Sequence, residues 1–557
     1  MSSVGIGGVP LDQEDPRADL TWGTIGALVD QVAERFDAIE AVVDGDVRLT
    51  FAQLAGEVDA YARGFMAAGT ATGDRVAIWA PNCVEWMLAA LGALRAGAVL
   101  VPLNTRFKGS EAAYILQSSG ATVLATVRGF LGFDYPAMLQ GEDVADLSTI
   151  VLLRDEGGAP DGVIALADFL AAGQAIDPNA SASRAAAVRP DDTSDLIFTS
   201  GTTGYPKGAA TTHAQSLRTF GTWASIVGLA PGDRYLIVNP FFHTFGYKAG
   251  ILACLMAGAT VVPEPVFDPK KVMVRIAEER ISVLPGPPTL YQSVLADPQR
   301  AAYDLSSLRL GVTGAAVVPV ELVHAMRDEL GFSTVLTAYG LTESCGTVTM
   351  CRRSDSAEVI AHTSGRAIPG LEVQVVVDGE PVPAGQPGEI VVRGYTVMSG
   401  YWGNPEATAE AIDPDGWLHT GDIGVMDAQG NIAITDRLKD MFVVGGFNAY
   451  PAEIEAALRR HPSVGQVAVV GVPDQRMGEV GCAYIVPSAT AGGLEAGDLG
   501  RTVLEWARDA MANYKVPRSV VIVEALPVNA SGKVLKRELR DRMAAGKDQV
   551  VTSERSK

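Results

Sequence analysis

The chain has 557 residues, of which 48% are hydrophobic and 20% charged, with a formal net charge of −21 at pH 7. This length exceeds one ordinary core, so we expect two or more domains. The acidic balance argues against a broad nucleic-acid or anionic-membrane surface, because both need a basic footprint. An anionic ligand would therefore need a local positive site.

The five cysteines are Cys83, Cys254, Cys345, Cys351 and Cys482. Because they are scattered, odd in number and without metal-ligand spacing, we expect buried thiols in a reducing compartment. The chain up to Asp19 has no basic start followed by a long apolar core, so no secretory signal is predicted. The most apolar stretch, Val76 to Leu103, is interrupted by prolines and charges, which argues against a membrane span. A cytoplasmic monomer or homodimer is predicted.

Short β-branched runs alternate with Ala/Leu-rich segments along most of the chain. A strand is predicted over Val76–Trp79, a helix over Val84–Ala96 and a strand over Val99–Val101. Further strands are predicted over residues 121–126, 196–199 and 235–238. This alternation predicts βαβ units, that is, an α/β fold with a parallel-type sheet flanked by helices.

The run from Thr199 to Gly208 follows one of these strands and combines hydroxyls, glycines and one lysine. Backbone amides freed by glycine, together with hydroxyls and the charge of Lys207, suit phosphate oxygens. Lys207 lies between Pro206 and Gly208, whereas a Walker A lysine follows a glycine and precedes Ser/Thr. With only eleven lysines in the chain, one inside such a loop gains weight. A phosphate chemistry other than the Walker A type is predicted.

The composition changes again near Asp436. Strands are predicted over residues 388–394 and 431–435 before it, and a helix over 451–460 and a strand over 467–470 after it. We expect an N-terminal domain of residues 1–437 and a small mobile C-terminal α+β domain of residues 438–557. The end of the chain from Gly546 is expected to fray.

Four further motifs follow the phosphate-type loop in a fixed order. They are Ala338–Glu343 (AYGLTE), Gly416–Asp422 (GWLHTGD), Asp436–Asp440 (DRLKD) and Asn529–Lys533 (NASGK). Together the five segments resemble the adenylate-forming superfamily of acyl-CoA synthetases, luciferases and peptide-synthetase adenylation domains. The resemblance covers nearly the whole chain, and five ordered motifs are more specific than any one of them. It implies an AMP-forming acid–thiol ligase that joins a carboxylic acid to AMP, releases pyrophosphate and transfers the acyl group to coenzyme A.

The resemblance also implies a binding site for ATP and Mg²⁺. The β- and γ-phosphates would lie on Thr199, Ser200, Gly201, Thr202, Thr203, Gly204 and Lys207, and the adenine slot on Gly314, Ala315, Ala316, Ala338, Tyr339 and Gly340. Asp422 and Arg437 match the residues that hold the ribose. Glu343 matches the Mg²⁺ ligand, an oxygen donor of the kind this ion prefers, and Thr342 the hydroxyl at the α-phosphate.

The C-terminal motifs imply a catalytic lysine and a moving domain. Lys533 matches the lysine that bridges the substrate carboxylate and the α-phosphate, and its distance in sequence from Lys207 implies that the C-terminal domain rotates to deliver it. Lys439 matches the hinge residue. Gly445, Gly446 and Phe447 match the loop that lines the pantetheine tunnel of coenzyme A.

The acid is indicated by the segment around His243, which matches a histidine at the mouth of the acyl pocket. Amino-acid-activating domains carry an aspartate here, so a non-amino carboxylic acid is favoured. Pocket residues by resemblance are His243, Phe245, Tyr247, Ala249, Val312, Gly314, Ala338 and Cys345. Their mostly small or apolar character suggests a medium-sized hydrophobic body.

Three segments narrow the acid further. Residues 241–250, 285–289 and 349–352 look like the actinobacterial CoA ligases of steroid breakdown, which activate a bicyclic indanedione propanoate. A medium-chain fatty acid or an aryl acid is the nearest alternative substrate. A luciferase-like oxygenase would share the adenylation motifs and is the alternative from another class.

Overall fold

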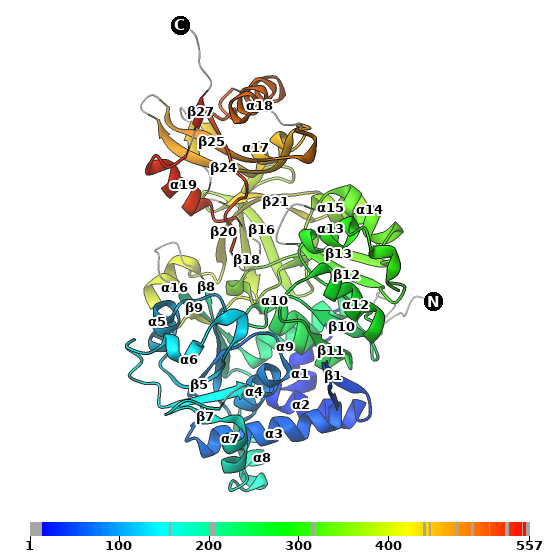
Figure 1. Ribbon diagram of the computed structural model, residues 1–557, viewed down its shortest axis with the longest axis vertical. Helices are drawn as coiled ribbons and strands as arrows, with labels where there is room; N and C mark the ends of the chain where they lie inside the picture. Colours follow the sequence, from blue (N-terminus) through cyan, green and yellow to red (C-terminus); the bar gives the residue numbers. More distant parts are fainter. Residues whose placement is uncertain are drawn as a thin grey trace. The chain divides into compact units, whose positions relative to one another are not determined.

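The computed structural model describes residues 14–154, 158–199, 206–314, 318–437, 440, 442–444, 447–449, 451–474, 477–491, 495–511, 513–529, 534–548 and 550–552. The chain divides into two compact units, Met1–Val373 with Val392–Leu418, and Gln374–Val391 with His419–Lys557 (Figure 1). Each unit has its own hydrophobic core. The predicted domain boundary at residue 437 stays a prediction.

An eight-stranded sheet of the first unit carries most of the predicted strands. Its order is β19 (Gly400–Tyr401), β9 (Lys207–Thr212), β8 (Thr193–Thr199), β4 (Val99–Pro102), β3 (Arg75–Trp79), β5 (Ala121–Val127), β6 (Thr149–Arg154) and β7 (Ile164–Ala165). From β8 to β7 neighbouring strands are parallel, whereas β9 runs antiparallel to β8 and β19 antiparallel to β9. The predicted strands are confirmed, and the phosphate-type segment falls where the sheet changes from parallel to antiparallel.

The helix α4 (Val84–Arg95) makes the βαβ crossover between β3 and β4, as predicted. Nearly all of its side chains are buried, which suits its sequence VEWMLAALGALR, apolar except for Glu85 and Arg95 near its ends. A Cβ on Gly92 would lie 2.6 Å from the Cβ of Tyr61 in α3 (Phe51–Ala67). Glycine therefore lets these two helices approach closely.

Two further sheets of the first unit meet edge to edge. One has the order β10 (Arg234–Ile237), β11 (Thr260–Pro263), β1 (Glu40–Asp44) and β2 (Val47–Thr50), and the other β12 (Leu310–Gly314), β13 (Thr334–Tyr339), β14 (Thr349–Met350) and β15 (Arg366–Ala367). Val283 bridges both sheets, because it pairs with Tyr235 and with Leu310. Within each sheet parallel and antiparallel pairs occur together.

Other helices of the first unit cover these sheets. They are α1 (Ala18–Trp22), α2 (Ile25–Phe36), α5 (Gly109–Ser119), α6 (Tyr135–Met138), α7 (Leu166–Gly173), α8 (Pro178–Ala187), α9 (His213–Val227), α10 (Thr244–Gly246), the π-helix η3 (Tyr247–Leu252), α11 (Ala253–Ala257), α12 (Pro269–Glu279), α13 (Pro288–Ala296), α14 (Val320–Asp328), α15 (Ala357–His362) and α16 (Pro405–Ala411). Short 3₁₀ turns η2 (Phe130–Gly132), η4 (Arg300–Ala302) and η5 (Thr342–Ser344) connect elements. None of the described helices is long and apolar enough to cross a membrane.

Among its described residues, the second unit contains a mixed sheet covered by the helices α17 (Pro451–Leu458), α18 (Ala496–Ala510) and α19 (Lys536–Ala544). The sheet is formed by β22 (Phe442–Val444), β23 (Phe447–Ala449), β24 (Val464–Asp474), β25 (Gly478–Pro487), β26 (Ser519–Ile522) and β27 (Val550–Thr552), with the turn η6 (Ala489–Ala491). The expected fraying from Gly546 is wrong for Val550–Thr552, because β27 pairs antiparallel with β26.

A separate five-stranded sheet carries the GWLHTGD and DRLKD motifs. Its order is β17 (Glu380–Pro381), β16 (Leu371–Val377), β18 (Pro387–Gly394), β20 (Leu418–Met426) and β21 (Ile432–Arg437).

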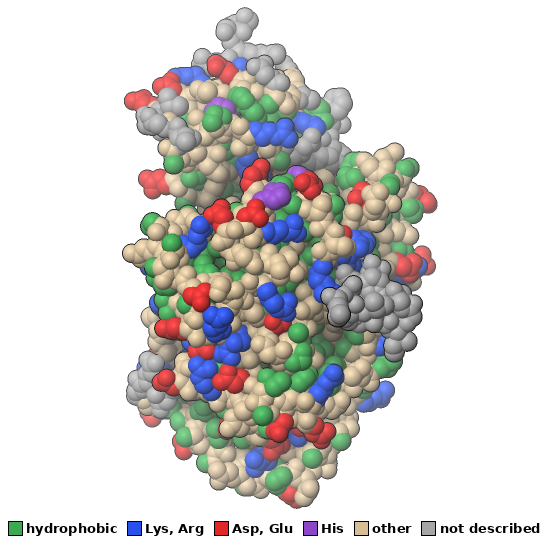
Figure 2. All heavy atoms as spheres, turned by 90° about the vertical axis from the view of Figure 1, so that its right-hand side faces the viewer, with side chains coloured by type: hydrophobic (Ala, Val, Ile, Leu, Met, Phe, Trp, Pro, Cys, Tyr) green, Lys and Arg blue, Asp and Glu red, His purple; other side chains and the backbone are tan. Residues whose placement is uncertain are grey.

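The predicted buried thiols are confirmed, since all five cysteines are buried and free. Over the face shown in Figure 2, acidic and basic side chains are interspersed.

Candidate active site

The β8–β9 hairpin brings Thr199 and Lys207 together. The two residues are directly opposite in the antiparallel register, at the ends of their strands. Residues Ser200, Gly201, Thr202, Thr203 and Gly204 of the predicted phosphate loop lie outside the described residues. The described ends of the loop thus place one hydroxyl and one ammonium beside each other.

Glu343 joins this corner from the turn η5, which follows β13. Its Oε1 accepts hydrogen bonds from Thr199 Oγ1 and from Tyr401 OH, both at 3.0 Å. Its backbone carbonyl accepts from Met398 N at 2.8 Å. The predicted metal ligand and a predicted phosphate-binding hydroxyl therefore meet at one carboxylate, next to the buried Thr342.

Tyr401 is a site residue that the sequence did not reveal. It lies on the short edge strand β19, where it pairs with Ala209 of β9. Its ring centroid is 5.2 Å from Lys207 Nζ, within the range of a cation–π contact. Burial, reinforced by the charge of Glu343, raises the pKa of Tyr401 well above its ordinary value, so the phenol stays protonated and donates. The pairing of β19 with β9, which no sequence pattern indicated, brings this residue to the site.

The predicted adenine slot lies at the carboxyl ends of β12 and β13. Gly314 and Ala338 are register partners in this parallel pair, and a Cβ on Gly314 would lie 3.0 Å from the carbonyl oxygen of Ala338. A Cβ on Gly340 would lie 2.4 Å from the carbonyl oxygen of Gly346, so the turn after Tyr339 requires glycine. Ala315 and Ala316 lie outside the described residues. Carboxyl ends of adjacent parallel strands are where α/β sheets bind ligands.

The predicted ribose residues lie on neighbouring strands. Asp422 of β20 is the register partner of Arg437 of β21, whose side chain is outside the described part. Asp422 is buried, with only 4% of its surface exposed. Its backbone amide donates to Thr420 Oγ1 at 3.1 Å. Glu389 of β18 accepts from Gly421 N at 3.0 Å and lies 2.9 Å from His419 Nδ1. These bonds fix the backbone that carries Asp422.

His243 caps the N-terminus of α10, where its Nδ1 accepts from the amide of Phe245 at 3.2 Å. The residue His243 is exposed at the surface. Protein atoms around the ring nevertheless displace water from it, and this desolvation lowers the pKa of His243. Such a neutral ring is suited to contact an uncharged substrate body.

The other predicted pocket residues fall into two groups. Phe245, Gly314 and Ala338 are partly exposed. Tyr247, Ala249, Val312 and Cys345 are at most 1% exposed and are enclosed by protein. The structure therefore places half of the predicted acyl pocket, His243 included, within reach of solvent.

Asn82 holds the segment that leads to His243, a role that no sequence pattern indicated. Its Nδ2 donates to the carbonyls of Ile237, Asn239 and Glu264 at 3.1, 2.9 and 3.2 Å. Its Oδ1 accepts from the amide of Phe241 at 2.8 Å. A buried amide that satisfies four backbone groups fixes the ends of β10 and β11 beside the acyl segment.

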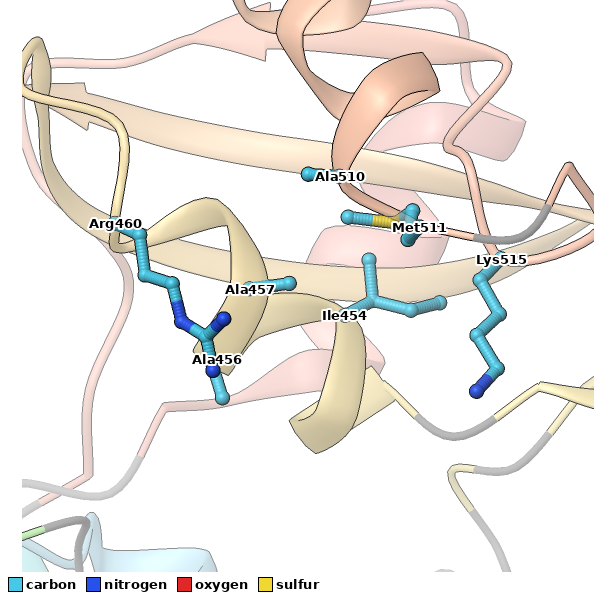
Figure 3. A pocket seen from close by; sticks show the side chains of 7 residues that line it. All are labelled: Ile454, Ala456, Ala457, Arg460, Ala510, Met511 and Lys515. Atoms are coloured by element: carbon cyan, nitrogen blue, oxygen red, sulfur yellow. The ribbon is translucent and has the colours of Figure 1, made fainter.

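Several predicted residues fall outside the described part of the chain. They are Lys439, Gly445, Gly446 and Lys533, together with the side chain of Phe447, whose backbone begins β23. A hollow of about 380 Å³ in the second unit is lined by Ile454, Ala456, Ala457, Arg460, Ala510, Met511 and Lys515 (Figure 3). None of the predicted site residues lines it.

Comparison with known families matches both parts of the chain. A family model described as AMP-binding enzyme matches residues 29–402, and one described as AMP-binding enzyme C-terminal domain matches residues 453–533. The chain belongs to the AMP-binding enzyme family. The predicted adenylate-forming ligase is thereby confirmed, as is the acyl-CoA synthetase-like fold. Members of this family use ATP, so the predicted ATP requirement of the site agrees with its family.

Several relatives extend over nearly the full chain. A 7a-methyl-1,5-dioxo-octahydro-1H-inden-4-yl propanoyl:CoA ligase of Rhodococcus jostii is 50% identical over 521 residues, covering 93% of this chain and 98% of that protein. A ligase of the same name from Mycobacterium tuberculosis is 49% identical over 519 residues, with the same coverage of 93% and 98%. A mitochondrial medium-chain acyl-CoA ligase of Homo sapiens is 34% identical, covering 98% of this chain and 91% of that protein.

Solved structures of the family also resemble the chain. A fatty acyl CoA synthetase of Mycobacterium tuberculosis is 31% identical with a TM-score of 0.72, covering 96% of this chain and 100% of that chain. An anthranilate CoA ligase in complex with anthranoyl-AMP is 28% identical with a TM-score of 0.83, covering 95% and 99%.

Proposed function

We propose that the protein is an ATP-dependent CoA ligase whose acid is a propanoate attached to a bicyclic, methylated dioxo-indane body. The observation that carries the proposal is the 50% identity to the Rhodococcus jostii ligase over 93% of this chain. The medium-chain ligase of Homo sapiens, at 34% identity, supports the fatty-acid alternative less strongly. The accessible, uncharged His243 supports a non-amino acid at the pocket mouth.

The first half-reaction joins the acid carboxylate to the α-phosphorus of ATP and breaks the bond to pyrophosphate. As the attacking carboxylate oxygen gives up its charge, negative charge develops on the leaving pyrophosphate oxygen and on the other oxygens bound to phosphorus, so fixed cations and hydrogen-bond donors stabilise the transition state. Lys207 and the hydroxyl of Thr199 are the described groups that would hold the leaving pyrophosphate. The ring of Tyr401, 5.2 Å from the ammonium, helps to keep Lys207 at the end of its strand.

The carboxylate oxygens of Glu343 are ligands of the kind that fits a Mg²⁺ ion. Among the described residues no group of three or more His, Cys, Asp or Glu side chains could hold a metal. Mg²⁺ in nucleotide sites is commonly bound by one or two carboxylates, substrate phosphates and water. Glu343 would supply that carboxylate, and the bound ion would neutralise charge on the phosphates. The hydroxyls of Thr199 and Tyr401 keep the carboxylate oriented.

The second half-reaction transfers the acyl group from AMP to the thiol of coenzyme A. Lys533 would assist the first step by bridging the acid and the α-phosphate, with Thr342 at the same phosphate. Tyr339, Asp422 and Arg437 would hold the adenosine, and Gly445, Gly446 and Phe447 the pantetheine. Rotation of the C-terminal domain about Lys439 would replace the arrangement for adenylation by the arrangement for thioester formation.

The test is ATP-driven thioester formation across a panel of acids, with AMP release measured in parallel. The panel contains the indanedione propanoate, octanoate and a cinnamate-like acid. We expect the indanedione propanoate to have the highest kcat/KM. Turnover of octanoate alone would overturn the assigned acid, and light or oxygen uptake without coenzyme A would instead favour a luciferase-like oxygenase.

A further inference from the structure

A fully buried ion pair joins the π-helix η3 to the β8–β9 hairpin, away from the loop of the hairpin. Lys248 Nζ is 2.9 Å from Asp195 Oδ1 and donates to Thr211 Oγ1 at 2.7 Å. The side chains of Lys248 and Asp195 are 0% and 1% exposed. Burial is the largest influence and would lower the pKa of Lys248, but the charge of Asp195, the contact with Cys345 and the hydrogen bonds to both together raise it, so the ammonium stays charged.

The carboxylate of this pair has further donors. Ser194 Oγ donates to Asp195 Oδ2 at 2.7 Å, and Thr211 Oγ1 donates to Asp195 Oδ1 at 2.7 Å. Replacing such a pair by apolar residues of similar volume is often neutral or stabilising, so stability alone does not account for it. A geometric role is the better explanation.

The third contact of the ammonium is the sulfur of Cys345, at 3.6 Å. Cys345 ends the turn that carries Glu343, and its φ of 56° lies in the left-handed region that non-glycine residues rarely adopt. The sulfur also lies 3.9 Å from Ser216 Oγ of α9. The turn is thus attached to the hairpin at two places. Thr199 of the hairpin donates to Glu343 directly, and Lys248, which binds Asp195 and Thr211 of the hairpin, contacts Cys345.

Lys248 comes from the segment that follows His243. It lies in η3, a π-helical turn whose six residues are all buried. π-turns are rare and frequently occur at functional sites. One ammonium therefore contacts the phosphate hairpin and the turn of Glu343 while belonging to the acyl segment.

We propose that Lys248 is a positioning residue for adenylation. By binding Asp195, Thr211 and Cys345 together, it fixes the Thr342–Glu343 turn relative to Thr199 and Lys207 before ATP binds. It touches no reacting atom. The proposal rests on the adenylate-forming activity of the proposed function and does not depend on which acid is used.

The test removes both charges at once, by Lys248→Met with Asp195→Asn. Lys248→Met alone leaves a buried carboxylate without its cation and is expected to lower the melting temperature. The double variant should regain most of that loss. It should nevertheless bind Mg²⁺·ATP about tenfold more weakly in calorimetry, the scale seen when groups that orient a ligand are lost. The KM of the acid in ATP–pyrophosphate exchange should stay within about twofold of the wild-type value.

Two other variants complete the test. Cys345→Ala cuts only the link to the turn, so it should weaken Mg²⁺·ATP binding in the same direction by a smaller factor, without an unpaired charge. Arg95→Met is the matched control, because it removes another buried cation, 2.6 Å from Asp30, and should lower the melting temperature without changing Mg²⁺·ATP affinity.

Wild-type Mg²⁺·ATP affinity in both the double variant and Cys345→Ala would overturn the proposal and make the pair purely structural. An equal loss in Arg95→Met would overturn it as well. The calorimetry uses Mg²⁺·ATP without acid, so a wrong assignment of the acid would appear only in the panel of acids.

Discussion

The two halves of the β8–β9 hairpin use charge in opposite ways. Near the loop, Lys207 is partly exposed and faces Tyr401 and the site of Glu343. Four residues further from the loop along each strand, Asp195 and Thr211 enclose the ammonium of Lys248 without solvent. Under the proposed function the half near the loop would exchange its partners for phosphate, whereas the enclosed half has its partners already in place.

This difference indicates that the enclosed half fixes the geometry of the half near the loop. A group that must bind and release a ligand cannot be fully satisfied in the free protein. Its position then depends on neighbours that are satisfied. The substitutions Glu343→Gln and Tyr401→Phe perturb the half near the loop, and His213→Asn perturbs the surroundings of the enclosed half.

Glu343→Gln should have the largest effect, because it removes the charge that faces the metal while keeping the side-chain size. We expect ATP–pyrophosphate exchange to fall by about a hundredfold or more, the scale for losing one preorganised electrostatic group. Raising the Mg²⁺ concentration should recover part of the rate. The exposed Glu372→Gln is the control and should behave as wild type. Exchange within a few-fold of wild type would remove Glu343 from the site.

Tyr401→Phe should have an intermediate effect, because it keeps the ring near Lys207 and removes one hydrogen bond to Glu343. One such bond is worth about 1 kcal/mol, which corresponds to about a fivefold lower kcat/KM for Mg²⁺·ATP. Tyr395→Phe loses a bond to the carbonyl of Pro369 and serves as the control. Equal effects of the two substitutions would show that Tyr401 has no special place at the corner.

His213→Asn should change the pH dependence of stability with little effect on activity. His213 is buried beside the enclosed half, where its Nδ1 accepts from Ile25 N at 3.3 Å, and burial lowers its pKa to about 4. Between pH 6.5 and about 4 the unfolded chain binds this proton and the folded chain does not. Stability is therefore present above pH 6.5 and falls by up to about 3 kcal/mol as the pH drops through this window.

Denaturant unfolding from pH 7 to pH 4 measures this slope. Asparagine can still accept from the Ile25 amide but does not titrate, so the variant should lose less stability on acidification than the wild type. The exposed His362→Asn should retain the wild-type slope. An unchanged slope in His213→Asn would contradict the assignment.

Local patterns predicted much of the fold. The strands β3, β4 and β5 are short apolar runs, and the helix α4 between β3 and β4 is a mostly apolar segment, so their neighbours in sequence decide their structure. The strand β27 was missed because its structure depends on pairing with β26, whose sequence position is remote. Terminal segments are expected to fray only when no such partner exists.

The residues of the candidate site show the same contrast between local sequence patterns and partners from distant segments. Thr199 and Lys207 were predicted because their run combines hydroxyls, glycines and a lysine that suit phosphate, and Glu343 because its motif resembles that of the adenylate-forming superfamily. Tyr401 and Lys248 were not, because their roles come from partners that the fold brings from distant segments. A lone tyrosine or lysine carries no signal of such partners in the sequence.

A crystal structure of the protein with Mg²⁺ and ATP tests the central claim most directly. We predict the β- and γ-phosphates within hydrogen-bond distance of Lys207 Nζ and Thr199 Oγ1, and the metal on the carboxylate of Glu343. We also predict that Lys248, Asp195 and Cys345 keep their contacts. Phosphates held elsewhere, or a metal without Glu343 among its neighbours, would contradict the account.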